Sequence, residues 1–261
     1  MKTKIKTCAE MLSDIMMKLR DEPLLSDFKY LKSYDSFRLK VKDGWYEIYL
    51  SHSRIPHWWM KSRDGSEITA DFLQIIPSSS RRFDVMWKWF EEFYPYEVSR
   101  VRGFNNIYIK PEDYDIPNEF YFSLDGGNFD KEYHRLYLML EILAEGIFEY
   151  NTLDSVFNRK VKMYLSDNIE KPPFGVVWIF EDLLLTRIVK PAKYSALKKV
   201  MEQHLKRLSN NKEPNYLDYE SKIPVMIERL EELGDEIRAQ RTPMPGIDHD
   251  PIWDKIRERI G

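Results

Sequence analysis

The chain opens with a helical pattern of apolar residues and then changes to a strand-like one. Apolar side chains recur every three or four positions over Thr7–Arg20, which predicts a helix. Apolar and polar residues then alternate over 37–42 and 45–50, on either side of Asp43-Gly44. This arrangement predicts a hairpin with a type I′ turn, because both central positions of that turn need φ > 0. A further strand over 67–76 would extend the hairpin into an antiparallel meander with one face on a core.

After the serines at 78–80 the period becomes that of a helix. Four aromatic residues recur at helical spacing from this point, namely Phe83, Trp87, Phe90 and Tyr94. We therefore predict a helix that one of the serines caps. Short strands are predicted over 106–110 and 119–124, and Asn128 is expected to cap the helix that follows them.

The second half of the chain has a mainly helical pattern. Apolar stripes at helical spacing predict four helices, over 129–148, 176–188, 194–208 and 219–233. Pro224 is compatible with the first turn of the last helix, and Gly234 stands where it could end that helix. Residues 159–172 fit a strand or a helix equally well.

Together these elements predict an α+β protein. We expect an N-terminal helix plus an antiparallel β-meander with covering helices, followed by a mainly helical C-terminal part. The sheet region is placed at 1–127, the helical region at 128–240, and a proline-broken tail with a short terminal helix at 241–261. Residues 1–240 can also form one compact unit, because the helix after residue 128 could cover the sheet.

The tail carries three prolines and one glycine within 241–251. Residues 252–260 then form a short amphipathic stretch that includes Trp253. A helix of this length is marginal in isolation, so it has to dock on something. Docking on the protein's own body and docking on a partner both remain open.

Composition and charge narrow the class of protein. Aromatic residues make up 14% of the 261 residues, which suits both a core and an interface. The net charge is −3, divided into +4 over 1–110 and −7 over 111–261, and a dedicated duplex-DNA binder would show a far stronger basic bias. Cys8 is the lone cysteine, and the longest stretch without a charged residue has nine residues. We therefore expect no disulfide, no signal peptide, no membrane span and a cytoplasmic protein.

The sequence carries none of the common catalytic or cofactor-binding motifs. The chain has no GxGxxG, no GxxxxGK[ST], no GxSxG and no HExxH motif, so a Rossmann, P-loop or α/β-hydrolase enzyme is not indicated. His52 and His57 flank a proline-containing loop without a third ligand type nearby, and we interpret them as polar residues beside a turn. Asp248-His249-Asp250 precedes Pro251 and is interpreted as a helix start. We expect no catalytic residue, no metal site and no cofactor.

The most distinctive feature is a stretch of 32 residues that is rich in tryptophan and arginine. The candidate binding residues are Trp58, Trp59, Arg81, Arg82 and Trp89, together with Trp253 in the tail. We expect Trp58 or Trp59 to pack and the other to present a surface. Arg81 and Arg82 are expected in the first turn of the helix after the serines, where a cation needs a compensating partner. Trp89 lies off the apolar stripe of that helix, which predicts partial exposure.

Three hypotheses for function follow. The leading one is a non-enzymatic, protein-binding protein of an adaptor or immunity type, which uses the aromatic-rich surface, the C-terminal helix or both. The first alternative is a hydrolase or transferase with dispersed catalytic residues, which would hold titratable groups with shifted pKa values in a pocket. The second alternative is a binder of single-stranded nucleic acid through the tryptophan–arginine stretch. The sequence leaves the oligomeric state open.

Overall fold

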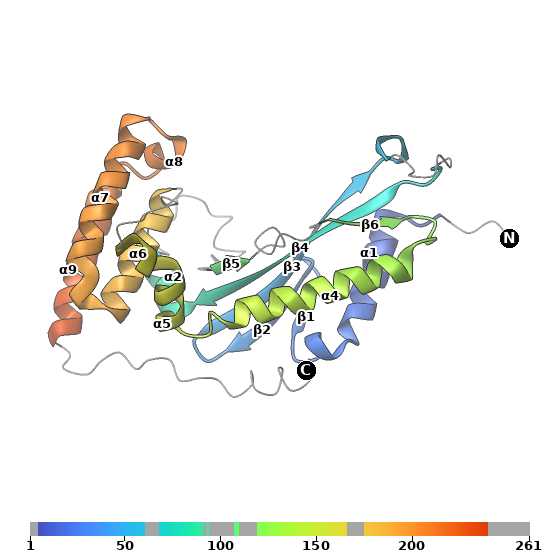
Figure 1. Cartoon of the computed structure of the whole chain (residues 1–261), viewed down its shortest axis with the longest axis horizontal. Helices are drawn as coiled ribbons and strands as arrows, with labels where there is room; N and C mark the ends of the chain where they lie inside the picture. The colour runs from blue at the N-terminus through green and yellow to red at the C-terminus, as the bar shows by residue number, and fades with distance from the viewer. Residues whose placement is uncertain are drawn as a thin grey trace. The chain divides into compact units, whose positions relative to one another are not determined.

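The computed structural model describes residues 5–60, 68–90, 93, 107–109, 119–165 and 175–239, with backbone only for 107–109 and 235–239 (Figure 1). Contacts group the described residues into two compact units. The first comprises residues up to 81 and 108–148, and the second comprises 82–107 and 149–239. The fold is α+β, as predicted. The helix after residue 128 groups with the sheet. The division into regions 1–127, 128–240 and 241–261 stays a prediction.

The first unit is built on a six-stranded sheet. Its strands are β1 (Lys29–Leu31), β2 (Ser36–Val41), β3 (Gly44–Ile55), β4 (Phe72–Phe83), β5 (Ile107–Ile109) and β6 (Phe120–Ser123). They are ordered β1-β2-β3-β4-β5, and β6 pairs antiparallel with the start of β4, where Phe72 faces Ser123. The strands predicted over 106–110 and 119–124 are confirmed as β5 and β6. Strands β1, β2 and β3 pair antiparallel in chain order and form the predicted meander.

The predicted hairpin is confirmed, but its turn differs from the prediction. Val41 pairs with Gly44, so Lys42 and Asp43 form the two-residue loop and Gly44 begins β3. Gly44 has a φ of 151°, whereas neither Lys42 nor Asp43 has a positive φ. The prediction of a type I′ turn at Asp43-Gly44 is therefore wrong. Asp43 instead turns its carboxylate to Arg81 on β4, at 2.5 Å.

Strand β4 is longer than the sequence pattern suggested. The serines at 78–80 lie inside the strand and are buried, so none of them caps a helix. Their hydroxyl groups find partners within the unit: Ser79 donates to the carbonyl of Leu143 at 2.9 Å and Ser80 to the carbonyl of Glu47 at 3.5 Å. These bonds remove most of the cost of burying a polar group. The next helix, α2 (Asp84–Phe90), therefore begins only after the strand ends.

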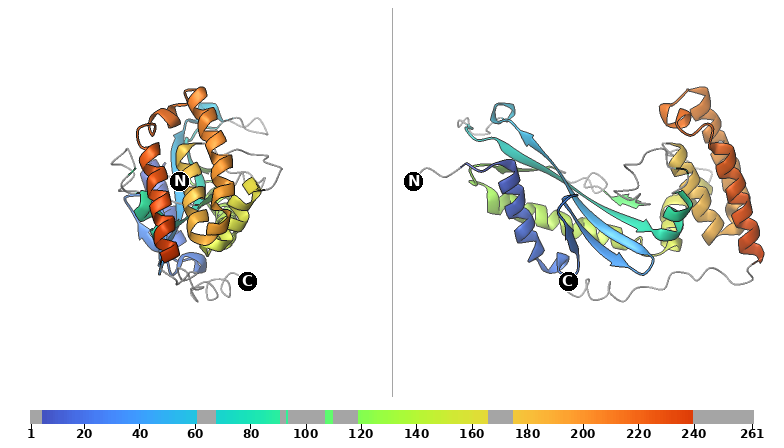
Figure 2. Two further views of the ribbon diagram at one scale, coloured as in Figure 1. Left: turned by 90° about the vertical axis from the view of Figure 1, so that its left-hand side faces the viewer. Right: turned by 180° about the vertical axis from the view of Figure 1, so that it is seen from behind.

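Helices α1 (Cys8–Arg20) and α4 (Phe129–Phe148) pack on the sheet (Figures 1 and 2). A short 3-10 turn, η1 (Pro23–Leu25), follows α1. Thr7 and Glu10 form a capping box that fixes the start of α1, as the predicted helix requires. The core between helices and sheet is made of fully buried apolar side chains, including Met11, Ile15, Leu19, Phe37, Ile48, Leu73, Phe122, Leu136, Leu140 and Leu143. The Asn128 side chain bonds the backbone of β6, at Ser123 and Tyr121.

The second unit is helical. Its elements are α2, α5 (Leu153–Val156), the π-helix η4 (Phe157–Val161), η5 (Lys162–Leu165), α6 (Val176–Val189), η6 (Pro191–Lys193), α7 (Tyr194–Asn210), α8 (Pro214–Leu217) and α9 (Ile223–Ala239). Helix α6 is buried on nearly every side, and α7 and α9 both pack against it (Figure 2). The predicted helices over 176–188 and 194–208 are confirmed as α6 and α7. In the ambiguous segment, 159–165 is π-helix and then 3-10 helix, and 166–172 lies outside the described residues.

The last predicted helix is confirmed with one correction. Helix α9 contains Pro224 in its first turn, as expected, but it continues past Gly234 to Ala239. Gly234 therefore does not end the helix. Gly234 lies inside α9, and its lack of a side chain leaves room for Arg187. A Cβ at this position would overlap the guanidinium group of Arg187.

Candidate binding surface at the Trp58–Trp59 turn

The two neighbouring tryptophans lie on a short 3-10 turn, η2 (His57–Trp59), which follows Pro56 at the end of β3. Trp58 is 69% exposed and Trp59 is 65% exposed. Their ring centroids are 5.6 Å apart and the ring planes meet at 85°, an edge-to-face arrangement. The expectation that one of them packs and the other is exposed was wrong, because the indole of each is largely open to solvent. We call these two residues with His57 the Trp58–Trp59 turn.

Asp71, immediately before β4, holds this turn in place. One carboxylate oxygen accepts two hydrogen bonds from His57, from its backbone N–H at 2.9 Å and from its ring Nδ1 at 2.8 Å. The other oxygen accepts the guanidinium of Arg54, from Nε at 2.8 Å and from a terminal nitrogen at 2.5 Å. Asp71 thus ties the end of β3 and the first residue of the turn to the start of β4.

The electrostatics of Asp71 agree with this geometry. The backbone and side-chain hydrogen bonds from His57, followed by those from Arg54, hold the pKa of the Asp71 carboxyl well below its usual range. In mildly acidic solution the carboxylate therefore keeps its charge and its hydrogen bonds to His57 and Arg54. The two indoles lie on a segment that is already anchored. Binding to a partner would therefore cost less conformational entropy than binding through a flexible loop.

Substitution of Asp71 by asparagine is expected to loosen the Trp58–Trp59 turn without unfolding the sheet. The amide cannot accept both His57 and Arg54 as the carboxylate does, so amide exchange at His57 and Trp59, the hydrogen-bonded amides of the turn, should speed up about tenfold. Hydrogen exchange followed by NMR measures this. Asp154→Asn, at an exposed ion pair with Lys190 in the other unit, is the matched control and should leave these amides unchanged. Equal exchange in wild type and Asp71→Asn would contradict the anchoring role.

The same contacts predict the pH dependence of the turn. A carboxyl whose pKa is lowered by native contacts contributes stability above its unfolded value of about 4, and this contribution is lost as pH falls towards the native pKa. Protection factors at His57 should therefore hold from neutral pH to about 4 and fall below it. The Asp71→Asn variant should lack this acid-dependent step. An acid-dependent step of equal size in Asp71→Asn would contradict this assignment.

Arg54 and Asp71, which anchor the Trp58–Trp59 turn, also influence the thiol of Cys8, the first residue of α1. Burial raises the pKa of the Cys8 thiol, and Arg54 and Asp71 act on it with opposite signs. The thiol is half-buried and protonated at neutral pH, which does not suit a nucleophile.

The two arginines of the predicted site are buried in the structure. Arg81 is 0% exposed, and its guanidinium pairs with Asp43, donates to the carbonyl of Trp45 at 3.3 Å and lies 4.4 Å from the ring centroid of Tyr46. Arg82 lies over the ring of Trp87. Both belong to strand β4, so their expected place in the first turn of a helix was wrong. The partners of Arg81 come from the β2–β3 loop and the start of β3, and Arg82 pairs with Asp84 at 3.4 Å, at the start of α2.

The predicted site residues do not form one cluster. Arg81 bonds to the first residues of β3, whereas the Trp58–Trp59 turn follows its last, and a strand of 12 residues spans about 36 Å. Trp89 belongs to the second unit and is half-buried, with its ring 5.0 Å from Phe93 and 6.5 Å from Phe180. This position agrees with the partial exposure predicted for Trp89. Trp253 and the terminal helix lie outside the described residues.

Sequence reasoning missed Arg54 and Asp71, which support the turn. They are 17 residues apart and become neighbours only through the pairing of β3 with β4. No local motif marks such a pair. A strand register, had it been known, would have brought them together.

The second unit holds a buried cluster of charged groups. Lys160, on the π-helix η4, lies 3.2 Å from Glu181 and 3.2 Å from Asp182, which are neighbours on α6. The two carboxylate side chains are 3% and 1% exposed. Burial alone would lower the pKa of Lys160, but Asp182 and Glu181 outweigh it and raise that pKa, so the amine stays protonated. A protonated, paired amine is a structural cation rather than a nucleophile.

Other features bear on the remaining hypotheses. The described residues contain no group of three or more His, Cys, Asp or Glu side chains arranged to hold a metal ion. Within the described parts of the chain, every helix is too short or too polar to cross a bilayer. Comparison of the chain with protein-family models, with curated proteins and with solved structures gave no match.

Proposed function

We propose that this chain is a non-enzymatic protein-binding protein of the adaptor or immunity type, and that the Trp58–Trp59 turn is its binding surface. The observation that carries the proposal is a pair of adjacent indoles, 69% and 65% exposed, on a turn anchored through Asp71. Isolated exposed apolar residues are ordinary on a protein surface, whereas two neighbouring tryptophans on a fixed turn are not. The partner is a protein with an apolar pocket or groove able to take both rings.

Tryptophan is the residue type most suited to such a role. Each ring offers on the order of 150–250 Å² of surface, and truncation of a buried tryptophan at an interface costs about 2 kcal/mol or more. The edge-to-face packing of the pair leaves ring surface on both residues open for contact. Since the turn is anchored, little of this gain is lost to ordering the chain on binding.

Affinity capture from the native source lysate, with mass spectrometry, tests the proposal. The baits are the wild-type chain, Trp58→Ala/Trp59→Ala, and Trp178→Ala as the matched control, since Trp178 is a 45% exposed tryptophan in the other unit. We expect a stoichiometric protein partner with the wild type and the control, and its loss from the double variant. Affinity for that partner, measured afterwards by calorimetry, should fall at least about 30-fold in the double variant.

The other hypotheses predict different results in the same experiment. A bait that ends at Gln240 loses the partner only if the tail with Trp253 carries the contact. Retention of the partner by Trp58→Ala/Trp59→Ala would refute the turn as the binding surface. Capture of nucleic acid, with binding that weakens steeply with salt, would favour the single-strand binder. Absence of any partner would shift weight to the enzyme hypothesis.

A further inference from the structure

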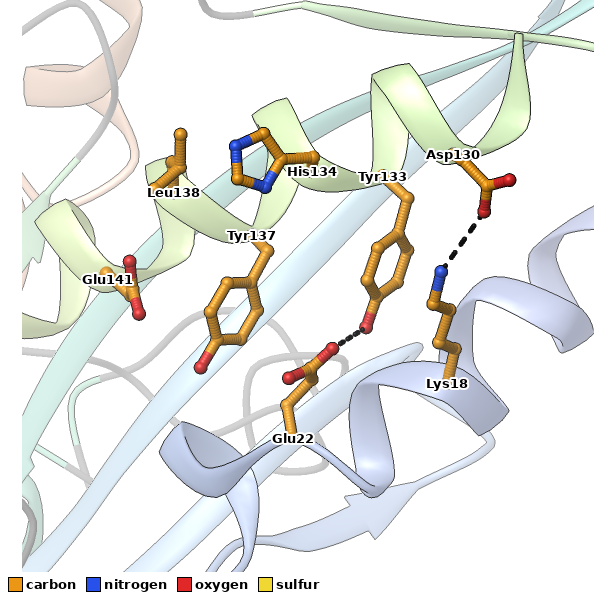
Figure 3. Close-up of a pocket in the computed structure, with 8 residues that line it drawn as sticks. All are labelled: Lys18, Glu22, Asp130, Tyr133, His134, Tyr137, Leu138 and Glu141. Carbon is orange, nitrogen blue, oxygen red and sulfur yellow. Dashed lines mark hydrogen bonds and ion pairs between the residues drawn. The ribbon is translucent and has the colours of Figure 1, made fainter. Parts of the chain in front are cut away.

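A groove runs between α1 and α4 in the first unit, away from the residues of the Trp58–Trp59 turn (Figure 3). Its volume is about 490 Å³, and it is lined by Lys18, Glu22, Asp130, Tyr133, His134, Tyr137, Leu138 and Glu141. Figure 3 shows the rings of Tyr133 and Tyr137 extending from α4 towards Glu22, at the end of α1. The groove therefore combines aromatic side chains with carboxylates.

The charges in the groove are unbalanced. Three carboxylates line it, against the single ammonium group of Lys18. Lys18 pairs with Asp130 at 3.3 Å. Among the described residues, neither Glu22 nor Glu141 forms an ion pair. Glu22 instead accepts a hydrogen bond from the Tyr133 hydroxyl, at 2.8 Å.

The pKa values of the two tyrosine hydroxyl groups reflect the resulting negative potential. Burial, then the hydrogen bond and charge of Glu22, raise the pKa of the Tyr133 hydroxyl. Burial, then the charges of Glu141 and Glu22, raise the pKa of Tyr137. Both shifts disfavour a further negative charge in the groove, and the same potential favours a positive one.

The protein itself places an ammonium group in this groove. The Lys18 Nζ atom lies 4.0 Å from the centroid of the Tyr133 ring and 5.4 Å from that of Phe129. A cation at this distance from an aromatic ring is held by the ring quadrupole. One turn along α4, Tyr137 lies between Glu22 and Glu141 (Figure 3). Within the part of the chain that the structure describes, no Lys or Arg side chain lies over the Tyr137 ring. The second position thus repeats the aromatic and acidic surroundings of the first.

We propose that the groove binds an organic ammonium group, seated on Tyr137 between the carboxylates of Glu22 and Glu141. The ligand chemistry is that of an aliphatic amine, either free as a small diamine or carried as the side chain of a lysine. The aromatic ring supplies the cation–π contact, and the two carboxylates supply charge and hydrogen-bond acceptors. This site is separate from the proposed protein-binding turn and does not depend on it.

Calorimetry and NMR titration of the full chain at constant ionic strength test the site. The probes are 1,4-diaminobutane for the free amine and Nα-acetyl-lysine amide for a lysine side chain, with sodium chloride as the blank. We expect saturable binding at millimolar concentration or below, with the largest chemical-shift changes at Tyr137 and Glu141. Tighter binding of the diamine points to a small molecule, and tighter binding of the lysine derivative points to a peptide.

Variants separate the site from a general charge effect. Glu141→Gln and Tyr137→Leu should each weaken binding about tenfold. Glu145→Gln, which removes an exposed carboxylate from the same helix, is the matched control and should change binding less than about twofold. Lys18→Met frees the Tyr133 ring and removes the competing cation, so it should tighten binding several-fold.

Two results would overturn the proposal. One is the absence of saturable binding by either probe beyond that of sodium chloride. The other is an equal loss for Glu145→Gln and Glu141→Gln, which would show that only the net charge of α4 matters. Circular dichroism of each variant checks folding, and Tyr137→Leu keeps the test valid if a charge variant is unstable. None of these outcomes bears on capture of a partner by the Trp58–Trp59 turn.

Discussion

Replacing Lys160 by methionine is expected to destabilise the second unit by about 3–5 kcal/mol, the usual cost of removing one partner from a buried ion pair. Lys160 neutralises the neighbouring carboxylates of Glu181 and Asp182, whose side chains are 3% and 1% exposed. Methionine preserves most of the length of the side chain and much of its packing, so the loss measured is mainly that of charge. Urea unfolding followed by circular dichroism gives the change in free energy.

The pH dependence of this variant identifies the cause. Burial raises the pKa of Asp182 even with Lys160 present, and removal of the cation should raise it further. A carboxyl with a raised native pKa binds its proton more readily folded than unfolded, so the fold gains stability as pH falls through that pKa. The stability gap between Lys160→Met and the wild type should therefore narrow as the pH is lowered. A gap that stays constant would indicate lost packing instead.

Two matched variants complete this test. Lys190→Met removes a half-exposed lysine that pairs with Asp154 at 2.7 Å in the same unit. An exposed pair contributes about 0–1 kcal/mol, so this control should be nearly neutral. The triple change Lys160→Met, Glu181→Gln and Asp182→Asn removes all three charges and should recover part of the loss. A triple variant as unstable as Lys160→Met would contradict the role of unpaired charge.

The elements that sequence periodicity predicted correctly are those in which one local pattern runs without interruption. Helices α1 and α4 show apolar stripes over their whole length, and the β2–β3 hairpin shows strict alternation on both sides of its turn. Such patterns reflect which face is buried, and burial determines the element. The α+β class follows from these elements alone.

The errors lie where long-range contacts determine the local conformation. The polar serines of β4 resemble a strand end, but Ser79 is satisfied by a carbonyl of α4, 64 residues away. The type I′ turn at Asp43-Gly44 was wrong because Val41 pairs with Gly44, and Asp43 in the resulting loop bonds to Arg81, 38 residues away. In each case the partner that stabilises the residue is remote in sequence, and a local pattern carries no information about it.

The candidate site was predictable only in part. Composition singled out Trp58 and Trp59, and the structure places both on the surface. Composition also singled out Arg81, whose guanidinium is buried, because a basic residue gives no local sign of the carboxylate that pairs with it. The anchoring by Asp71 and the groove between α1 and α4 depend on which elements become neighbours. Their residues carry no motif and could be recognised only in three dimensions.

Substitution of Gly234 by alanine is expected to destabilise the second unit, against the ordinary effect of this change. In the interior of a helix, glycine to alanine usually stabilises by about 0.5–1 kcal/mol. Here a Cβ at position 234 would overlap the guanidinium group of Arg187. That group is buried and cannot move freely, because it donates to the Leu230 carbonyl at 2.9 Å, pairs with Glu231 at 2.5 Å and lies 3.8 Å from the centroid of the Tyr194 ring.

Displacing Arg187 would leave a buried cation without its partners, so Gly234→Ala should cost about 2–4 kcal/mol in the free energy of unfolding. The decisive comparison is the same substitution in an Arg187→Ala background. With the guanidinium removed, the three atoms nearest to the added Cβ are gone, and the ordinary gain of about 0.5–1 kcal/mol should return. The cycle consists of the wild type, Gly234→Ala, Arg187→Ala and the double variant, each measured by urea unfolding. The change of sign would show that Gly234 is required for the close packing of α6 against α9. A stabilising effect of Gly234→Ala in the wild-type background would show that Arg187 can shift without loss.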